Sequence, residues 1–213
     1  MKDCTLSGVM YGRMRPIALE VEESSSLILD QDLLKAHCAV DGDSLDDLLA
    51  AYEAAAIAWA EGEMHRTLLA RSHSFTVTDF PRFGRQEVLL PNGLCQAITG
   101  VQYSSNGNIE TLSDYRSELG SENGGRLYPP RGTSWPSVDL DAPAPVVFNY
   151  TAGWETAAAI PANIKHALMF AVEDMLDVRG VTDLAALMAI AASGRTFDTR
   201  SALISRYVIN IIY

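Results

Sequence analysis

The stretch from Thr67 to Tyr150 constrains the fold most, because its composition does not permit long helices. Seven of the nine prolines of the chain lie in it: Pro81, Pro91, Pro129, Pro130, Pro136, Pro143 and Pro145. Proline has no backbone N–H to donate and clashes with the preceding helical turn. Between the prolines stand short runs of β-branched and aromatic residues, separated by turn residues. This pattern predicts a block of β-strands.

Two of these runs alternate apolar and polar residues, as a strand does when one face is buried. They are 68–80 (LLARSHSFTVTDF) and 144–153 (APVVFNYTAG). The side chains expected on the buried face are Phe75, Val77, Val146, Phe148 and Tyr150. Both runs are predicted to be strands of the β block.

Turn residues place a further hairpin between these two strands. Pro91-Asn92-Gly93 is a turn signal, and the run 95–103 (CQAITGVQY) follows it. Gly100 is a candidate β-bulge inside this run. Asn106-Gly107 fits a two-residue hairpin turn into 109–112 (IETL), because both positions of such a turn need positive φ.

Helical periodicity flanks the β block on its N-terminal side. Asp30 is expected to cap a short helix that ends near Val40. Ser44, with Asp47 three residues later, resembles a capping box at the start of a longer helix that ends near Gly62. The apolar stripe of this helix consists of Leu45, Leu48, Leu49, Tyr52, Ala55, Ala56 and Trp59.

Helical periodicity returns on the C-terminal side. A helix is expected from Pro161 to Gly180, because proline fits the first helical turn and glycine a helix end. Its stripe is Ile164, Ala167, Leu168, Ala171, Val172, Met175 and Leu176. Asp183 is predicted to cap a short helix over 183–193, and Asp198 another through Ser201–Arg206.

The sequence therefore predicts an α+β protein, a helical bundle from N- and C-terminal helices with an inserted antiparallel β block. The expected parts are an N-terminal arm (1–28), a helical part (29–66), a β subdomain (67–155), C-terminal helices (156–200), and a helix end with an extended tail (201–213). The two helical parts are expected to pack together, because each apolar stripe needs a partner.

The charge excludes some partners. A net charge of -11 argues against binding to a phosphate backbone, which requires clustered Lys and Arg, but it is compatible with a wall past which DNA slides. Three scattered cysteines, Cys4, Cys38 and Cys95, favour reduced thiols in a cytoplasm. No signal-peptide run or membrane-spanning stretch is evident, so we expect no membrane partner.

No pattern in the chain predicts catalysis, a metal or a cofactor. His37-Cys38 lacks the spacing of a zinc site, and the acidic turn at Asp41 departs from the calcium-loop pattern. The loop 120–125 is glycine-rich but has no lysine before a helix, so it is a poor phosphate cradle. Trp135 and Trp154 stand beside turns. They either pack the β block onto the helices or form a glycan-binding platform.

Several segments, read in order, resemble one family. An acidic turn leads into the long helix 41–61, and SHSFTVTDFP (72–81) follows. Next come 87–118, then GGRLYPPRGTSWP (124–136), PVVFNYTAGW (145–154) and IPANIKHALMFAVEDML (160–176), with a weaker echo at SALISRYV (201–208). The run from Ile28 to Leu176 resembles the head–tail connector, or adaptor, family of tailed bacteriophages and related gene-transfer particles. Its motifs (the SWP turn, the strand ending in AGW, the Ile-Pro helix start) are structural.

This resemblance implies a non-enzymatic virion protein of the neck, assembled from the host cytoplasm. Members form a ring, usually twelvefold, that bridges the portal protein to a stopper or tail-completion protein. The ring lines the channel through which DNA passes without sequence-specific binding. Other neck roles, such as stopper or tail-completion protein, are the alternative within the particle, and a small-ligand or glycan-binding module is the alternative outside it.

The C-terminal segment SRYVINIIY is the candidate partner-binding site. It has high β-propensity and one charged residue, Arg206, so as an exposed strand it would aggregate. The residues assigned to binding the portal or a neighbouring subunit are Arg206, Tyr207, Val208, Ile209, Asn210, Ile211, Ile212 and Tyr213. The prediction is a strand added to another protein's sheet, with Ile209, Ile211 and Tyr213 in its pockets. Pairing within the chain's own β block is the alternative.

Overall fold

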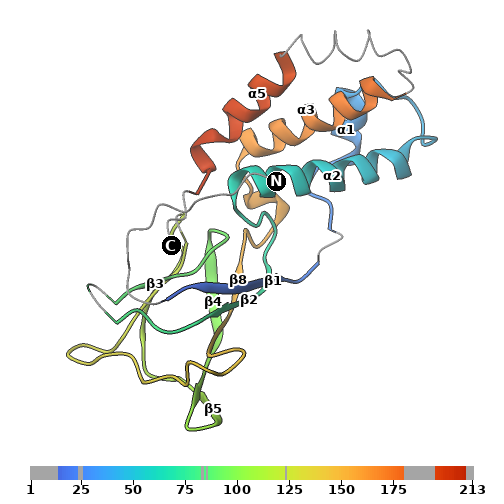
Figure 1. Ribbon diagram of the computed structural model, residues 1–213. Helices are drawn as coiled ribbons and strands as arrows, with labels where there is room; N and C mark the ends of the chain where they lie inside the picture. Colours follow the sequence, from blue (N-terminus) through green and yellow to red (C-terminus); the bar gives the residue numbers. More distant parts are fainter. Residues whose placement is uncertain are drawn as a thin grey trace. The chain divides into compact units, whose positions relative to one another are not determined.

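A computed structural model of the chain describes residues 14–23, 26–82, 84, 86–122, 124–179 and 195–209 (Figure 1). The described residues form two compact units. A sheet unit contains 14–23 and 70–153, and a helical unit contains 26–69, 154–179 and 195–209. Mixed α+β architecture, predicted from the alternation of residue patterns, is confirmed.

The sheet unit holds two antiparallel sheets. The five-stranded sheet has the order β1-β2-β8-β4-β5, and its strands span Pro16–Val21 (β1), Arg71–Val77 (β2), Val146–Ala152 (β8), Cys95–Ser105 (β4) and Asn108–Thr111 (β5). The smaller sheet has the order β3-β7-β6, over Val88–Leu89, Arg126–Tyr128 and Arg116–Glu118. Strand β1 precedes the helices in the chain, so the large sheet is not built from one inserted stretch alone.

The core of the sheet unit lies on the face that the alternation predicted. Phe75 pairs with Phe148 in register across β2 and β8. Phe75, Val77, Val146, Phe148 and Tyr150 are all buried. The register of β4 shifts between Ile98 and Gly100, where the bulge was expected. Asn106 and Gly107 both have positive φ in the turn between β4 and β5, which confirms the predicted hairpin.

The helical unit consists of α1 (Gln31–His37), α2 (Asp46–Met64), η1 (Ala157–Ala159), α3 (Ala162–Val178), α5 (Arg195–Ile204) and η2 (Ser205–Tyr207). Both α2 and α5 pack against α3, and α1 contacts α3 as well (Figure 1). Helical segments from the two sides of the β block thus meet, although a regular bundle stays a prediction. No helix among the described residues has the length and apolar character needed to cross a membrane.

Helix ends agree only in part with the sequence. The Asp30 side chain caps α1 as predicted, by accepting from the backbone N–H of Leu33. Ser44 does not begin α2, which starts at Asp46 after a Leu45 that makes no side-chain cap. Lys35 binds both Asp43 and Asp46, at 2.9 and 2.6 Å. These ion pairs favour a turn before Asp46 over a helix that starts at Ser44.

Five other helix predictions differ from the structure or lie outside the described residues. Helix α2 ends at Met64, two residues beyond Gly62, and His65 takes the left-handed conformation there. Pro161 is the N-cap of α3, one position before the first turn. Helix α5 begins at Arg195, so Asp198 lies inside it and not at its start. Helix α3 ends at Val178, two residues before the predicted Gly180, and the predicted helix over 183–193 falls outside the described residues.

Candidate interaction surfaces

The C-terminal helix α5 is attached to the rest of the helical unit by Arg200. Its guanidinium Nη1 lies 2.7 Å from Oδ2 of Asp174 on α3, and both side chains are largely buried. The same guanidinium lies 4.9 Å from the ring centre of Trp59 on α2. A charge-assisted hydrogen bond and a cation–π contact together fix α5 against both neighbours.

The residues that follow α5 are attached to the end of α2. The backbone N–H of Ile209 donates to the carbonyl oxygen of Met64 at 3.0 Å. Met64 is in the last turn of α2, where carbonyls have no partner within the helix. Arg66 Nε donates to the carbonyl oxygen of Tyr207 at 3.2 Å. The chain is thus held at two successive points.

Arg66 is the centre of this anchor, and it is 3% exposed. Its guanidinium lies 5.3 Å from the ring centre of Trp154, whose backbone N–H donates to the carbonyl of Leu68. Trp154 therefore packs inside the helical unit. Arg66 is not among the candidate residues predicted from the sequence. The sequence does contain an indication of its burial, because this arginine stands between a helix end and the apolar pair Leu68-Leu69.

The eight residues predicted to bind a partner, Arg206 to Tyr213, fall into three groups: buried residues, exposed residues and residues that the structure does not describe. Tyr207 and Ile209 are 6% and 5% exposed, so they pack within the helical unit. Arg206 and Val208 alternate with them and are exposed. Asn210, Ile211, Ile212 and Tyr213 lie outside the described residues. Ile209, which the alternation assigned to a partner's pocket, instead fills a place in its own unit.

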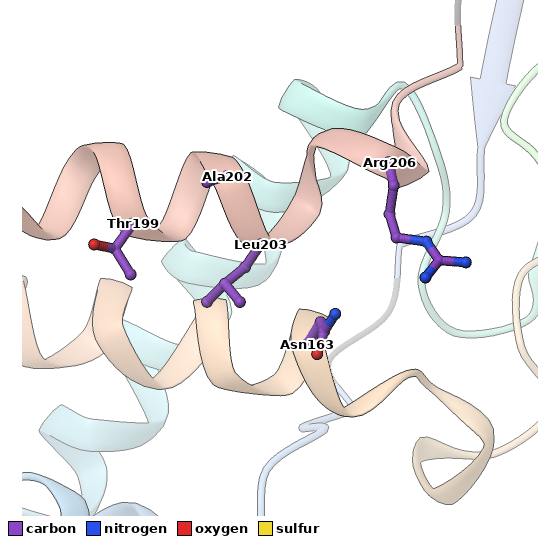
Figure 2. A pocket seen from close by; sticks show the side chains of 5 residues that line it. All are labelled: Asn163, Thr199, Ala202, Leu203 and Arg206. Carbon is purple, nitrogen blue, oxygen red and sulfur yellow. The ribbon is translucent and has the colours of Figure 1, made fainter.

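A pocket of about 510 Å³ lies beside this segment, between α3 and α5. Asn163, Thr199, Ala202, Leu203 and Arg206 line it. Figure 2 shows Leu203 reaching from α5 toward α3, with Asn163 on α3 and Arg206 at the end near η2. Leu203 and Ala202 make the wall apolar, and the exposed Arg206 supplies a positive charge. Such a lining fits an apolar group that has an acidic neighbour.

The other candidate residues have structural contacts. The indole N–H of Trp135 donates to the carbonyl of Gln86 at 2.7 Å, and its ring stacks on Phe80. At 4% exposed, Trp135 packs within the sheet unit and offers little surface to a sugar. The expectation that it packs the β block onto the helices is wrong, because its contacts are with its own unit.

The remaining polar candidates do not assemble a site. Lys35 holds the Asp43 carboxylate and lowers its pKa by hydrogen bonding to it. Burial raises the pKa of the Cys95 thiol to about 11, so this cysteine is a poor nucleophile. Among the residues described, no group of His, Cys, Asp and Glu has the arrangement of a metal site. In the glycine-rich loop, Gly125 packs tightly, because a Cβ on it would lie 2.7 Å from Cβ of Cys95.

Comparison with known proteins shows similarity at the level of the fold. No family model matches the sequence, and no curated protein matches it. Among solved structures, a chain in the neck of an empty gene transfer agent (GTA) particle, computed with C6 symmetry, aligns with a TM-score of 0.72 and 18% identity. A chain in the neck of a native GTA particle, computed with C12 symmetry, aligns with a TM-score of 0.65 and 20% identity.

A chain in the virion of a native gene transfer agent particle is similar too, with a TM-score of 0.67 and 18% identity. Each of these alignments covers 92% of this chain and 98% of the other. The alignment thus extends over both the sheet unit and the helical unit. The chain has the same fold as these particle proteins.

Proposed function

We propose that this chain is a structural subunit of the neck of a phage-like particle. The observation that carries the proposal is the extent of the structural match, 92% of this chain and 98% of a chain from a GTA neck. A common small module would match only one of the two units. The proposal agrees with the connector resemblance at the SWP turn, the AGW strand and the Ile-Pro helix start.

Within the neck, the proposed role is that of the adaptor ring between the portal and the stopper or tail. The similar GTA necks were computed with C6 and C12 symmetry, which supports a cyclic homo-oligomer for this chain. Identical chains in a ring meet through two different surfaces, one on each side of every subunit. The net charge of -11 suits a channel that DNA passes without being held.

The C-terminal residues Asn210–Tyr213 are the proposed docking strand for the portal. They directly follow Ile209, whose N–H is bound to Met64, so the strand would start from a fixed point. A fixed start lowers the entropy lost when the strand adds to a partner's sheet. Because Tyr207 and Ile209 are buried in the helical unit, the docking part is shorter than the sequence predicted.

Mixing the purified chain with its portal tests the role. We expect negative-stain images to show a ring seated on one end of the portal. Deleting Asn210–Tyr213 should leave the melting temperature within about 1 °C of the full chain, because the Ile209–Met64 bond remains, and should abolish seating. The substitution Leu33→Ser, on a residue of α1 that is 57% exposed, is the control.

Two results would contradict this account. If the ring sits on a stopper or tail tube and never on the portal, the chain is a different neck component. If the truncated chain seats as well as the full chain, the C-terminal residues are not the docking strand.

A further inference from the structure

The turn of the hairpin formed by β4 and β5 is bound by one carboxylate, that of Asp139, which lies outside the hairpin in sequence. Asp139 Oδ2 accepts from the backbone N–H of Gly107 at 2.8 Å and from Oγ of Ser104 at 3.3 Å. In return, the backbone N–H of Asp139 donates to the carbonyl of Ser104. These bonds to the charged form lower the pKa of Asp139, so the group is ionised at neutral pH. The turn at Asn106 is therefore preorganised.

This hairpin displays an isoleucine that is largely exposed in the part of the chain that the structure describes. Ile109 is 79% exposed, the largest exposed fraction among the large hydrophobic side chains described. It pairs with Ser104, so Ile109 shares a face with the residue that binds the Asp139 carboxylate. Leu140, next to Asp139, is 55% exposed. Ile109 and Asp139 together are called the knob below, because an exposed apolar side chain beside a negative charge suits docking to another surface.

Charge complementarity selects the surface that fits this knob. Of the three pockets described, one is bordered by Glu20 and Glu22, and another by Asp46 and Asp47. Both would repel Asp139. The pocket between α3 and α5 has Arg206 and no carboxylate among its lining residues, and its walls include Leu203 (Figure 2). It is an open groove of about 510 Å³, which is large enough for the side chain of one isoleucine.

We propose that Ile109 of one copy of this chain enters the α3–α5 pocket of the next copy, with Asp139 beside Arg206. The knob belongs to the sheet unit and the pocket to the helical unit, so the contact is heterologous. Repeated head to tail, a heterologous contact forms a ring when the rotation between successive copies closes, as the proposed neck role requires. This inference rests on the proposed function, because it takes the ring as the assembly in which the contact forms.

Substitutions in the knob and in the pocket test this contact. The quantity measured is the fraction of the chain in rings, by sedimentation velocity with and without the portal. Ile109→Asp should lower the ring fraction at least 10-fold at a concentration where the unsubstituted chain is mostly assembled. Leu33→Asp, on a residue 57% exposed on α1, is the control and should assemble normally. Both sites are exposed, so the melting temperatures should not change.

A double-substitution cycle tests the charge pair. Asp139→Asn keeps a side-chain oxygen for Gly107 and removes the charge, and Arg206→Gln removes the opposite charge. Each should weaken assembly about 3- to 10-fold, and the double variant should be no weaker than the worse single variant.

Three outcomes have distinct meanings. Rings from Ile109→Asp as abundant as those from Leu33→Asp would overturn the inference and leave the proposed function standing. Loss of rings with Arg206→Gln but not with Ile109→Asp would also overturn it, because the pocket then has another occupant. If the unsubstituted chain never forms rings, even with the portal, both the inference and the adaptor role are wrong.

Discussion

The two units of this molecule bury different kinds of side chain. The core of the sheet unit is apolar and aromatic, and its buried polar residues in the described part are His73 and Asp79. The core of the helical unit includes the buried charged residues Glu53 and Arg66. In the sheet unit the buried Asp79 pairs with Arg82, three residues away, whereas the buried charges of the helical unit lie where more distant segments are held.

Each buried charge of the helical unit holds a segment distant in sequence. Glu53 Oε1 accepts from the backbone N–H groups of Ile28 and Leu29, at 2.6 and 2.7 Å. Arg66 binds the carbonyl of Tyr207 across 141 positions of sequence. Buried charge adds little net stability, but removing one partner leaves the other unsatisfied. In the helical unit, buried charges therefore determine where segments distant in sequence lie.

The largest loss of stability is expected from a substitution in the aromatic core of the sheet unit. Phe148 is fully buried and its ring contacts those of Phe75 and Phe80. Phe148→Ala should lower the free energy of unfolding by about 3–5 kcal/mol. Denaturant titration measures the loss. The control Thr151→Ala, on the opposite face of β8, should cost less than about 1 kcal/mol. Equal losses would show that the sheet unit has no concentrated core.

A smaller but more localised effect is expected at Arg66. Arg66→Met keeps much of the side-chain length and removes the bond to the Tyr207 carbonyl and the cation–π contact with Trp154. We expect a loss of about 2–3 kcal/mol. Hydrogen exchange should quicken at Ile209, whose N–H is bound to Met64, while β2 and β8 stay protected. The control is Lys165→Met on α3. Uniform deprotection of both units would contradict the role of Arg66 as a local anchor.

Replacement of glycine by alanine should change the free energy of unfolding in opposite directions at one site in each unit. Gly125→Ala places a Cβ 2.7 Å from Cβ of Cys95, and this overpacking should cost about 1–3 kcal/mol. Gly62 is in the last turn of α2, with nothing within 4 Å of an added Cβ. Gly62→Ala should therefore stabilise the chain by about 0.5–1 kcal/mol through helix propensity. Thermal unfolding of the two variants checks the signs, and a shift in the same direction would contradict the packing described here.

The weakest effect is a pH dependence confined to the sheet unit. His73 is buried against Tyr150, and burial lowers its pKa below the ordinary value of about 6.5. The unfolded chain then binds more protons than the folded chain below that pH, so stability should fall as the pH drops beneath about 6.5. His73→Phe retains the stacking and should reduce this dependence in hydrogen exchange of β2. An unchanged profile would assign the dependence to another group.

Patterns within short stretches were enough to predict much of the sheet unit. Alternation fixed the buried face of β2 and β8, and Asn106-Gly107 fixed the hairpin, because strand facing and turn geometry depend on adjacent residues. Contacts across long sequence distances were not predictable. Nothing near Arg66 in the sequence indicates Tyr207, and a chain that ends in β-branched residues gives no sign that Ile209 is bound to Met64.

The position of this chain in an assembled particle tests the central claim most directly. A cryo-EM map of the neck, made from particles that carry the chain with a small C-terminal tag, locates it. The account predicts a closed ring between portal and tail, with density that fits both the sheet unit and the helical unit in every subunit. Particles in which the tag lies elsewhere, or in which the neck is complete without this chain, would contradict the account.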